Sequence, residues 1–139
     1  GLPRYLLATL RELVHLKNWL LKVKIDSLLI HEGATLLASA LNTPTYGGGM
    51  PAVPHALIND GQLNLLIGGS FNRLQTLLML PRLLFGKHLD RPRIQCYAFT
   101  NATIVCTALV PVAADGETLG FSSHVQVTCL PNALQVVKF

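Results

Sequence analysis

The chain has 139 residues, of which 50% are hydrophobic and 13% are charged, and its mean hydropathy is +0.43. This length fits one domain that can bury a core of its own. Because no run of about 18 apolar residues occurs, a membrane-spanning helix is not expected. The composition instead indicates apolar surface that a second domain or a membrane covers. The net charge of +4 suits an anionic ligand or a lipid surface and does not require nucleic acid.

The cysteines and histidines offer no recognisable metal or nucleophile motif. Cys96, Cys106 and Cys129 show no C-x-x-C spacing and lie in strand-like segments. Buried, reduced thiols of a cytosolic protein are therefore expected, without a zinc site. The five histidines show no ligand-like i, i+4 pair, so we expect them at the surface or in satisfied polar positions.

The first part of the chain changes from a helical to a strand period. Apolar residues three or four positions apart, with basic residues between them, predict an amphipathic helix over 3–20. From Leu21 the period is two, since Val23 and Ile25 alternate with charged residues, which predicts a strand with one exposed face. The segment 34–41 is almost wholly apolar or small and predicts a second strand covered on both faces.

Glycine and proline dominate the stretch from Tyr46 to Pro54, which reads Y-G-G-G-M-P-A-V-P. Glycine permits unusual backbone angles and proline fixes φ, so the stretch predicts a rigid, irregular loop. It lacks the Gly-Lys-Ser or Gly-Lys-Thr ending of a phosphate-binding P-loop. Asn59-Asp60-Gly61 predicts a turn, and its alternative use is a Mg²⁺ or Ca²⁺ site built from a carboxylate and neighbouring carbonyls.

A leucine-rich helix is expected in the middle of the chain. A strand pattern at 62–67 ends at two glycines, after which Ser70 is expected to cap a helix that begins at Phe71. Pro81 should kink this helix or divide it. We expect its leucines to pack on the core, with an adjoining basic cluster offering a secondary contact with anionic lipid. The leucines are Leu74, Leu77, Leu78, Leu83 and Leu84, and the basic cluster comprises Arg82, Lys87, His88, Arg91 and Arg93.

Strand patterns fill most of the last third of the chain, at 94–99, 102–110, 124–130 and 134–139. Asp115-Gly116 favours a tight hairpin turn that places Glu117 on the following strand. The ordinary interpretation of Glu117 is an exposed turn residue, and a catalytic carboxylate is the alternative. Together these patterns predict a single, mainly β domain over 1–139, an antiparallel β-sandwich-like structure with one or two covering helices.

Four sequence elements occur in order at suitable separations. They are Asn42 with Tyr46-Gly-Gly-Gly-Met50, Pro54-His-Ala-Leu-Ile-Asn-Asp-Gly61, Asp115-Gly-Glu117-Thr-Leu119 and Leu130-Pro-Asn-Ala-Leu134. With them the chain, over nearly its whole length, resembles the C-terminal domain of the diacylglycerol kinase catalytic family. This family includes bacterial phosphatidylglycerol and diacylglycerol kinases and sphingosine kinases. The chain departs from the pattern at Thr43, where the family has glycine, and at Thr118, where proline is common.

The resemblance implies an ATP-dependent kinase that phosphorylates a lipid hydroxyl. Its N-terminal domain would bind ATP through a Gly-Gly-Asp-Gly-Thr motif, which this chain lacks, so residues 1–139 are expected to be the C-terminal portion, inactive alone. The family implies Glu117 as proton acceptor. Phosphoryl transfer also needs an oriented substrate, so we expect Asp115, beside Glu117, to help orient the substrate or a cation. The family also implies a Mg²⁺ ion, with Ca²⁺ as the alternative, bound by Leu57, Asp60 and Gln62, the first and last through carbonyl oxygens.

The expected partners are a lipid with a free hydroxyl, such as diacylglycerol or phosphatidylglycerol, and the ATP-binding domain of the same protein. Nucleic acid is not expected, and a homodimer is left open. The protein is expected in the cytoplasm, at the membrane periphery. The competing hypothesis is a non-enzymatic β-sandwich module that binds lipid or protein through its apolar surface.

Overall fold

The computed structural model describes residues 15–46 and 49–134. Most of the helix predicted over 3–20, and all but the first residue of the strand predicted over 134–139, lie outside the described residues. The elements are β1 (Trp19–Ile25), β2 (Leu28–Leu41), β3 (Thr45–Tyr46), β4 (Met50–Pro51), β5 (Leu63–Gly69), α2 (Arg73–Leu84), β6 (Ile94–Phe99), β7 (Asn101–Ala114) and β8 (Glu117–Thr128).

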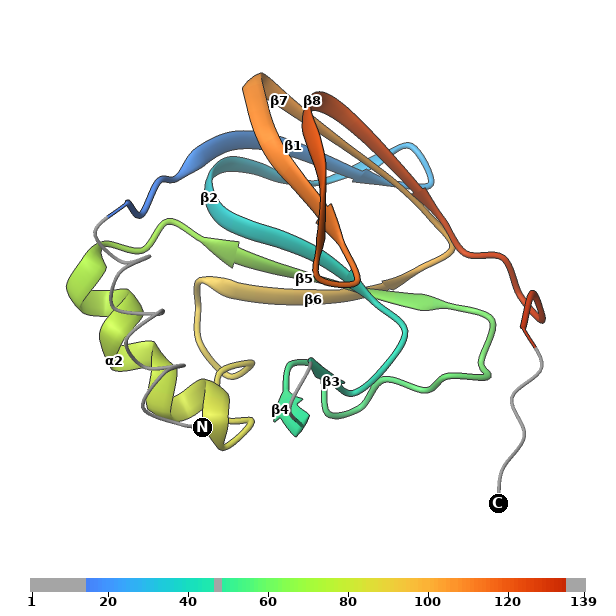
Figure 1. The fold of residues 1–139 in the computed structure, drawn as a ribbon, viewed down its shortest axis with the longest axis horizontal. Helices are drawn as coiled ribbons and strands as arrows, with labels where there is room; N and C mark the ends of the chain where they lie inside the picture. Colours follow the sequence, from blue (N-terminus) through green and yellow to red (C-terminus); the bar gives the residue numbers. More distant parts are fainter. Residues whose placement is uncertain (1–14, 47–48, 135–139) are drawn as a thin grey trace.

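Six strands form one antiparallel sheet in the order β6-β5-β2-β1-β7-β8, and β3 pairs with β4 in a small second sheet (Figure 1). Every strand pair in both sheets is antiparallel. In the described part of the chain, α2 is the α-helix that accompanies these sheets. The prediction of a mainly β, antiparallel, sandwich-like domain is therefore confirmed.

The period-two pattern of β1 is confirmed. Leu21 and Val23 are buried, whereas the lysines that follow each of them are exposed. The strand begins at Trp19, which pairs with Thr35 of β2, so the helix predicted to reach residue 20 is wrong at its end. Pairing with a neighbouring strand overrides a local helical pattern, because propensity is a weak influence beside tertiary contacts.

Strand β2 is longer and less covered than the sequence predicted. It begins at Leu28, directly after a tight turn in which Asp26 and Ser27 have positive φ. Thr35 is buried, but Leu37 is 42% exposed, so the prediction that both faces are covered is wrong at that position. Leu37 borders a cavity under α2, which explains its exposure.

Strand β5 runs through both glycines that were expected to end it. It continues to Gly69 because its last residues pair with β2, and Gly68 also pairs with Ile94 of β6. The residues from Asn64 to Gly68 are all buried, as expected for a strand inside a sheet with both faces covered.

The helix α2 starts two residues later than predicted. Asn72, instead of Ser70, caps it: the Asn72 side chain accepts from the backbone N–H of Gln75 at 2.8 Å, and the Gln75 side chain accepts from the Asn72 N–H at 3.1 Å. This reciprocal pair is a capping box, so the prediction that Ser70 caps the helix is wrong. Pro81 lies inside α2 and does not divide it.

The prediction that the leucines of α2 pack on the core is wrong for most of them. Four are between 41% and 64% exposed, namely Leu74, Leu77, Leu78 and Leu84. Leu83 is half-buried and faces the sheet with its neighbours along the helix. No residue of α2 is fully buried, so the helix covers the sheet loosely and presents apolar side chains at the surface.

The hairpin between β7 and β8 has the turn that was predicted. Asp115 and Gly116 both have positive φ, at 50° and 84°, and Ala114 pairs with Glu117. Positive φ at both central residues is the type I′ geometry that Asp-Gly favours. Strand β8 begins at Glu117, well before the predicted start at 124.

The outer half of this hairpin projects as a two-stranded arm, which we define as residues 107–123. β1 pairs with β7 only as far as Cys106. The pairing of β7 with β8 shifts register between Val105 and Val110, and both strands bend sharply in this part (Figure 1).

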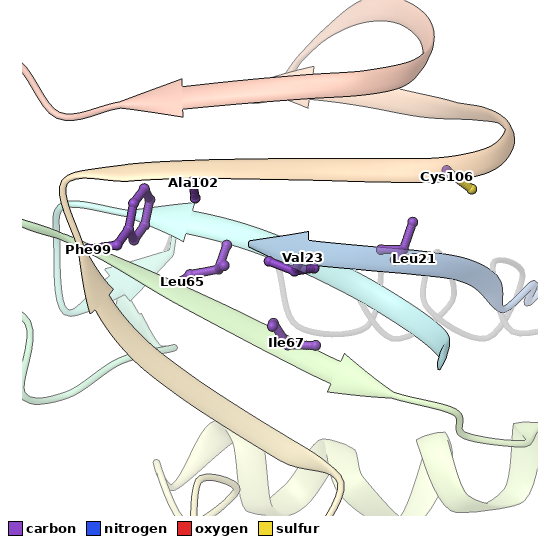
Figure 2. Close-up of a cluster of buried hydrophobic side chains, with 7 residues drawn as sticks. All are labelled: Leu21, Val23, Leu65, Ile67, Phe99, Ala102 and Cys106. Atoms are coloured by element: carbon purple, nitrogen blue, oxygen red, sulfur yellow. The ribbon is translucent and has the colours of Figure 1, made fainter. Parts of the chain in front are cut away.

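The main core lies where the sheet curls on itself. Leu65 and Ile67 of β5 point toward Leu21 and Val23 of β1 (Figure 2). The cluster is completed by Phe99, Ala102 and Cys106. A second cluster lies around Leu66, on the opposite face of β5, and contains Leu41, Ala52, Val53 and Ala56. Strand β5 therefore separates two apolar regions.

Candidate functional site

An apolar cavity of about 180 Å³ lies between α2 and the sheet. The helix contributes Thr76, Met79, Leu80 and Leu83, and the sheet contributes Leu36, Leu37, Leu66, Gly68 and Ile94; Tyr46, Phe71 and His88 complete the wall. Because Gly68 carries no side chain, the sheet leaves room beneath the helix at this point. Cavities lined mainly by aliphatic and aromatic side chains are typical of sites for apolar ligands.

His88 anchors the wall of this cavity to the glycine-proline loop. The side chain is 2% exposed, and its Nε2 donates to the backbone carbonyl of Ala52 at 2.7 Å. A carbonyl oxygen can only accept, so Nε2 carries a proton. The Nδ1 atom is buried and has no hydrogen-bond partner among the described residues. The expectation that each histidine is at the surface or satisfied is therefore wrong for His88.

The loop that holds Ala52 is ordered by its own backbone. The N–H groups of Ala52 and Val53 both donate to the carbonyl of Pro44, at 3.0 and 3.1 Å, and both residues are fully buried. Tyr46, on the same loop, lines the cavity. Burial raises the pKa of Tyr46, and a hydrogen bond with Ser39 partly offsets this shift. The described part of the predicted rigid loop is thus fixed against the cavity.

The predicted catalytic carboxylates lie on the arm. Asp115 and Glu117 are exposed at its turn, and among the described residues neither side chain forms a hydrogen bond or an ion pair. Only Gly116 separates the two residues in the chain. No hydrogen bond or ion pair within the described residues connects them to the Asp60 turn. Their catalytic role remains a prediction.

The predicted cation ligands lie in the turn that the sequence indicated. Asp60 Oδ1 accepts from the N–H of Gln62 at 3.0 Å, and Gly61 has a φ of 74°. One carboxylate oxygen is left without a partner among the described residues, and the other donors would be the carbonyls of Leu57 and Gln62. Such an all-oxygen set fits Mg²⁺ or Ca²⁺. Gly61 also faces Pro131, so two of the four ordered sequence elements meet here.

Within residues 15–46 and 49–134, no three His, Cys, Asp or Glu side chains gather as metal ligands. The Asp60 turn does not depend on such a cluster, since two of its three donors are carbonyls.

The three cysteines are free; Cys106 is buried, whereas Cys96 and Cys129 are half-buried. No helix in the described part of the chain is long and apolar enough to cross a membrane.

Sequence reasoning missed the cavity and the contact between His88 and Ala52. These residues are 36 positions apart, and no local pattern connects them. The composition offered one indirect signal, because a hydrophobic chain with few charged residues predicts apolar surface that a partner or a membrane covers. That signal gave neither the position nor the shape of the cavity.

Comparison with known proteins establishes the family. Residues 1–138 match the family model described as the YegS C-terminal NAD kinase beta sandwich-like domain, and the chain belongs to this family. Two curated relatives, both named diacylglycerol kinase, come from Mycobacterium tuberculosis strains CDC 1551 / Oshkosh and ATCC 25618 / H37Rv. Each is 28% identical over 138 residues, which is 99% of this chain and 44% of the relative. The chain thus spans less than half the length of these relatives.

Two solved structures from Bacillus anthracis str. Sterne share the fold. One aligns with a TM-score of 0.70 and 22% identity over 91% of this chain and 43% of its own. The other, a diacylglycerol kinase, aligns with a TM-score of 0.67 and 22% identity over 91% of this chain and 42% of its own. These likenesses confirm the β-sandwich-like architecture.

Proposed function

We propose that the chain is the lipid-binding and base-supplying part of an ATP-dependent kinase that phosphorylates a lipid hydroxyl. The observation that carries this proposal is the apolar cavity between α2 and the sheet, in a chain whose curated relatives are named diacylglycerol kinase. Each methylene group moved from water into such a cavity contributes about 0.8 kcal/mol. An acyl chain is therefore a suitable occupant.

The surface of α2 supports access from a membrane. Leu74 and Leu78 are 64% and 57% exposed, and Phe85, just after the helix, is 77% exposed. Arg82 and Lys87 lie in the same segment and would meet anionic headgroups. A peripheral contact through this helix would bring the mouth of the cavity to the lipid.

In the proposed reaction, the oxygen of the lipid hydroxyl attacks the γ-phosphorus of ATP while Glu117 accepts the hydroxyl proton. The bond from the γ-phosphorus to its bridging oxygen breaks, and ADP leaves. A second domain of the same protein would supply ATP. The exposed turn allows Glu117 to be reached from such a domain, and Asp115 beside it would orient the substrate or a cation.

Leu57, Asp60 and Gln62 would hold a Mg²⁺ or Ca²⁺ ion through a carboxylate and two carbonyl oxygens. When bound, such an ion adds a local positive charge and fixes the oxygens around it. We assign it a stabilising role in the turn, since the turn supplies protein oxygens and lies beside Pro131.

The proposal is tested by incubating the natural protein that contains this chain with ATP and a panel of lipids in mixed micelles. We expect one or more lipids with a free hydroxyl to be phosphorylated. Glu117→Gln should reduce kcat by at least about a hundredfold without changing the unfolding midpoint. The matched control is Asp90→Asn, which removes an exposed carboxylate elsewhere.

Two results would contradict the proposal at different points. Full turnover in the Glu117→Gln variant would show that Glu117 is not the proton acceptor, while the proposal that the protein is a lipid kinase would stand. Failure of every lipid to accept phosphate would remove the kinase itself and favour the non-enzymatic lipid-binding module.

A further inference from the structure

The arm, residues 107–123, carries an apolar face that the described part of the chain leaves uncovered. Pro111 pairs with Phe121, so these two side chains lie next to each other on one side of the arm. Leu109 lies two residues before Pro111 on β7 and therefore on the same side. Leu119 is exposed two residues before Phe121, where the pairing of β7 with β8 shifts register. Leu109, Leu119 and Phe121 are 62%, 67% and 70% exposed, and such a gathering of apolar side chains is typical of a contact surface.

The arm has few contacts of its own that hold it in place. Strand β1 pairs with β7 only as far as Cys106, so beyond this residue the arm is a two-stranded ribbon (Figure 1). Val110 packs against the main core near the base of the arm. A two-stranded hairpin is only marginally stable in water without a third strand or a packed face. The arm would therefore be stabilised by a partner that covers its apolar face.

A fixed arm matters for the proposed reaction. Glu117, the proton acceptor in that reaction, stands at the tip of the arm, where it pairs with Ala114. A general base has to be held within hydrogen-bond reach of the proton that it accepts. A contact that immobilises the arm would hold Glu117 in this position.

The apolar face and Glu117 lie on opposite sides of the arm. Ala114, the partner of Glu117, follows Pro111 on β7 by three residues. Successive residues of a strand point to opposite sides, so residues three positions apart point in opposite directions. A partner that covers Phe121 would thus immobilise the arm and leave the Glu117 carboxylate open to the substrate.

The charges of the arm disfavour a membrane as this partner. Residues 107–123 contain no lysine or arginine, and their two carboxylates, Asp115 and Glu117, are both at the tip. Anionic lipid attracts basic segments and repels acidic ones. Basic residues that would suit a lipid surface lie elsewhere, such as Arg82 in α2 and Lys87 just after it. A protein surface matches the neutral, apolar face of the arm better.

The size of the face favours a second domain over a second copy of the chain. Its four apolar side chains offer on the order of 400 Å². A stable complex of two free proteins buries about 800 Å² on each side, so this face alone is too small for a second copy. A domain of the same chain needs less area, because the link between the domains keeps their effective concentration in the millimolar range. Interfaces between domains of one chain begin at about 600 Å² in total, which this face would supply.

We propose that the apolar face of the arm, formed by Leu109, Pro111, Leu119 and Phe121, docks on the ATP-binding domain of the same protein and thereby positions Glu117. The choice of partner rests on the proposed function, which requires such a domain. The length of the curated relatives supports it, since this chain spans 44% of each. Phe121 has the largest side chain of the face, and we assign it as the main positioning residue.

Photo-crosslinking of the natural protein that contains this chain tests the contact. Phe121→benzoylphenylalanine places a photoreactive group on the apolar face. Irradiation of an equal mixture of isotopically light and heavy protein distinguishes links within one molecule from links between copies. We expect position 121 to link, within one molecule, to residues outside 1–139. Leu28→benzoylphenylalanine, at a position of β2 that is also 70% exposed, is the control and should give none of these products.

Four results would overturn the proposal. Products that join light and heavy protein would assign the face to a second copy of the chain. Products with lipid, in samples that contain phosphatidylglycerol vesicles, would assign it to a membrane. Equal yields of the same products from positions 28 and 121, or no product from position 121, would show that the face has no specific contact with a second domain.

Kinetics test whether the contact positions Glu117. Phe121→Ser should lower kcat of the natural protein about tenfold, because an interface loses an aromatic side chain, and should leave the KM for lipid and the unfolding midpoint unchanged. Phe121→Leu keeps an apolar side chain and should retain most of kcat. Leu28→Ser removes an equally exposed apolar side chain and should leave kcat unchanged. Equal values of kcat in Phe121→Ser and Leu28→Ser would overturn the positioning role of Phe121.

The outcome is separable from that of the proposed function. Links from position 121 to a second domain, in a natural protein that phosphorylates no lipid, would support the docking surface and contradict the lipid kinase. Phosphorylation of a lipid by a protein that gives no such links would support the lipid kinase and contradict the docking surface.

Discussion

His88 donates its Nε2 hydrogen to the carbonyl oxygen of Ala52 at 2.7 Å, and this contact joins the segment after α2 to the glycine-proline loop. His88→Phe would keep an aromatic ring of similar size but leave the carbonyl of the fully buried Ala52 unpaired. We expect the free energy of unfolding to fall by about 1–3 kcal/mol, measured by urea denaturation. His124→Phe, at an exposed position of β8, is the control. Equal stability of the two variants would show that the contact is unimportant.

Gly68→Val should fill the apolar cavity. A Cβ at this position would lie 3.4 Å from Leu37 Cγ, which is ordinary contact, so the strand should tolerate it. We expect the affinity for dioctanoylglycerol to fall about tenfold, because one added group in an apolar pocket has an effect of this size. Ala98→Val, on an exposed position of β6, is the control. Unchanged affinity in calorimetry would place the acyl chain elsewhere.

Gly116→Ala should strain the turn that carries the predicted catalytic carboxylates. A Cβ there would meet no atom within 4 Å, so the cost comes only from the φ of +84°. For an L-residue this is about 1–2 kcal/mol of unfolding free energy. Asp115→Asn keeps a residue suited to the turn and should leave stability unchanged in the same urea titration. An equal loss of unfolding free energy in Gly116→Ala and Asp115→Asn would contradict the explanation that the backbone angle at Gly116 causes the loss.

Cys96 should ionise only at a higher pH than an ordinary thiol, because burial raises its pKa. The thiolate is the reactive form, so the pH profile of its alkylation by iodoacetamide should be displaced upward in the native protein. Mass spectrometry of the Cys96 peptide would follow the rate, with the urea-unfolded chain as reference. The midpoint of the profile is the readout, since limited access alone would slow the reaction without moving it. Equal midpoints of the pH profile in the native and the urea-unfolded chain would refute the prediction.

Local patterns were sufficient where one short-range signal dominates. The alternation from Leu21 to Ile25 predicted β1, and Asp115-Gly116 predicted the hairpin turn, because these features depend on side-chain period and on backbone angles. They failed at Gly68, where pairing on both sides carries β5 through residues that end an isolated strand. They failed at Asn72 because Ser70 and Asn72 are both residue types that can cap a helix.

The cavity and the contacts of Arg93 could not be predicted from the sequence, because they depend on residues that are distant in the chain. Arg93 meets Phe71 only because β5 and β6 pair. The sequence did place Arg93 in a basic cluster next to the leucine-rich helix. It could not show that this arginine, instead of its neighbours, has its guanidinium fixed over an aromatic ring.

The alternation along β5 makes the strand sensitive to its register. Leu65 and Ile67 belong to the main core, whereas Leu66 and Gly68 line the cavity, so substitutions at neighbouring positions of one strand would affect different properties of the domain. A single residue inserted into β5 would turn the core side chains toward the cavity and the cavity side chains toward the core. Both the core and the cavity would then be disrupted.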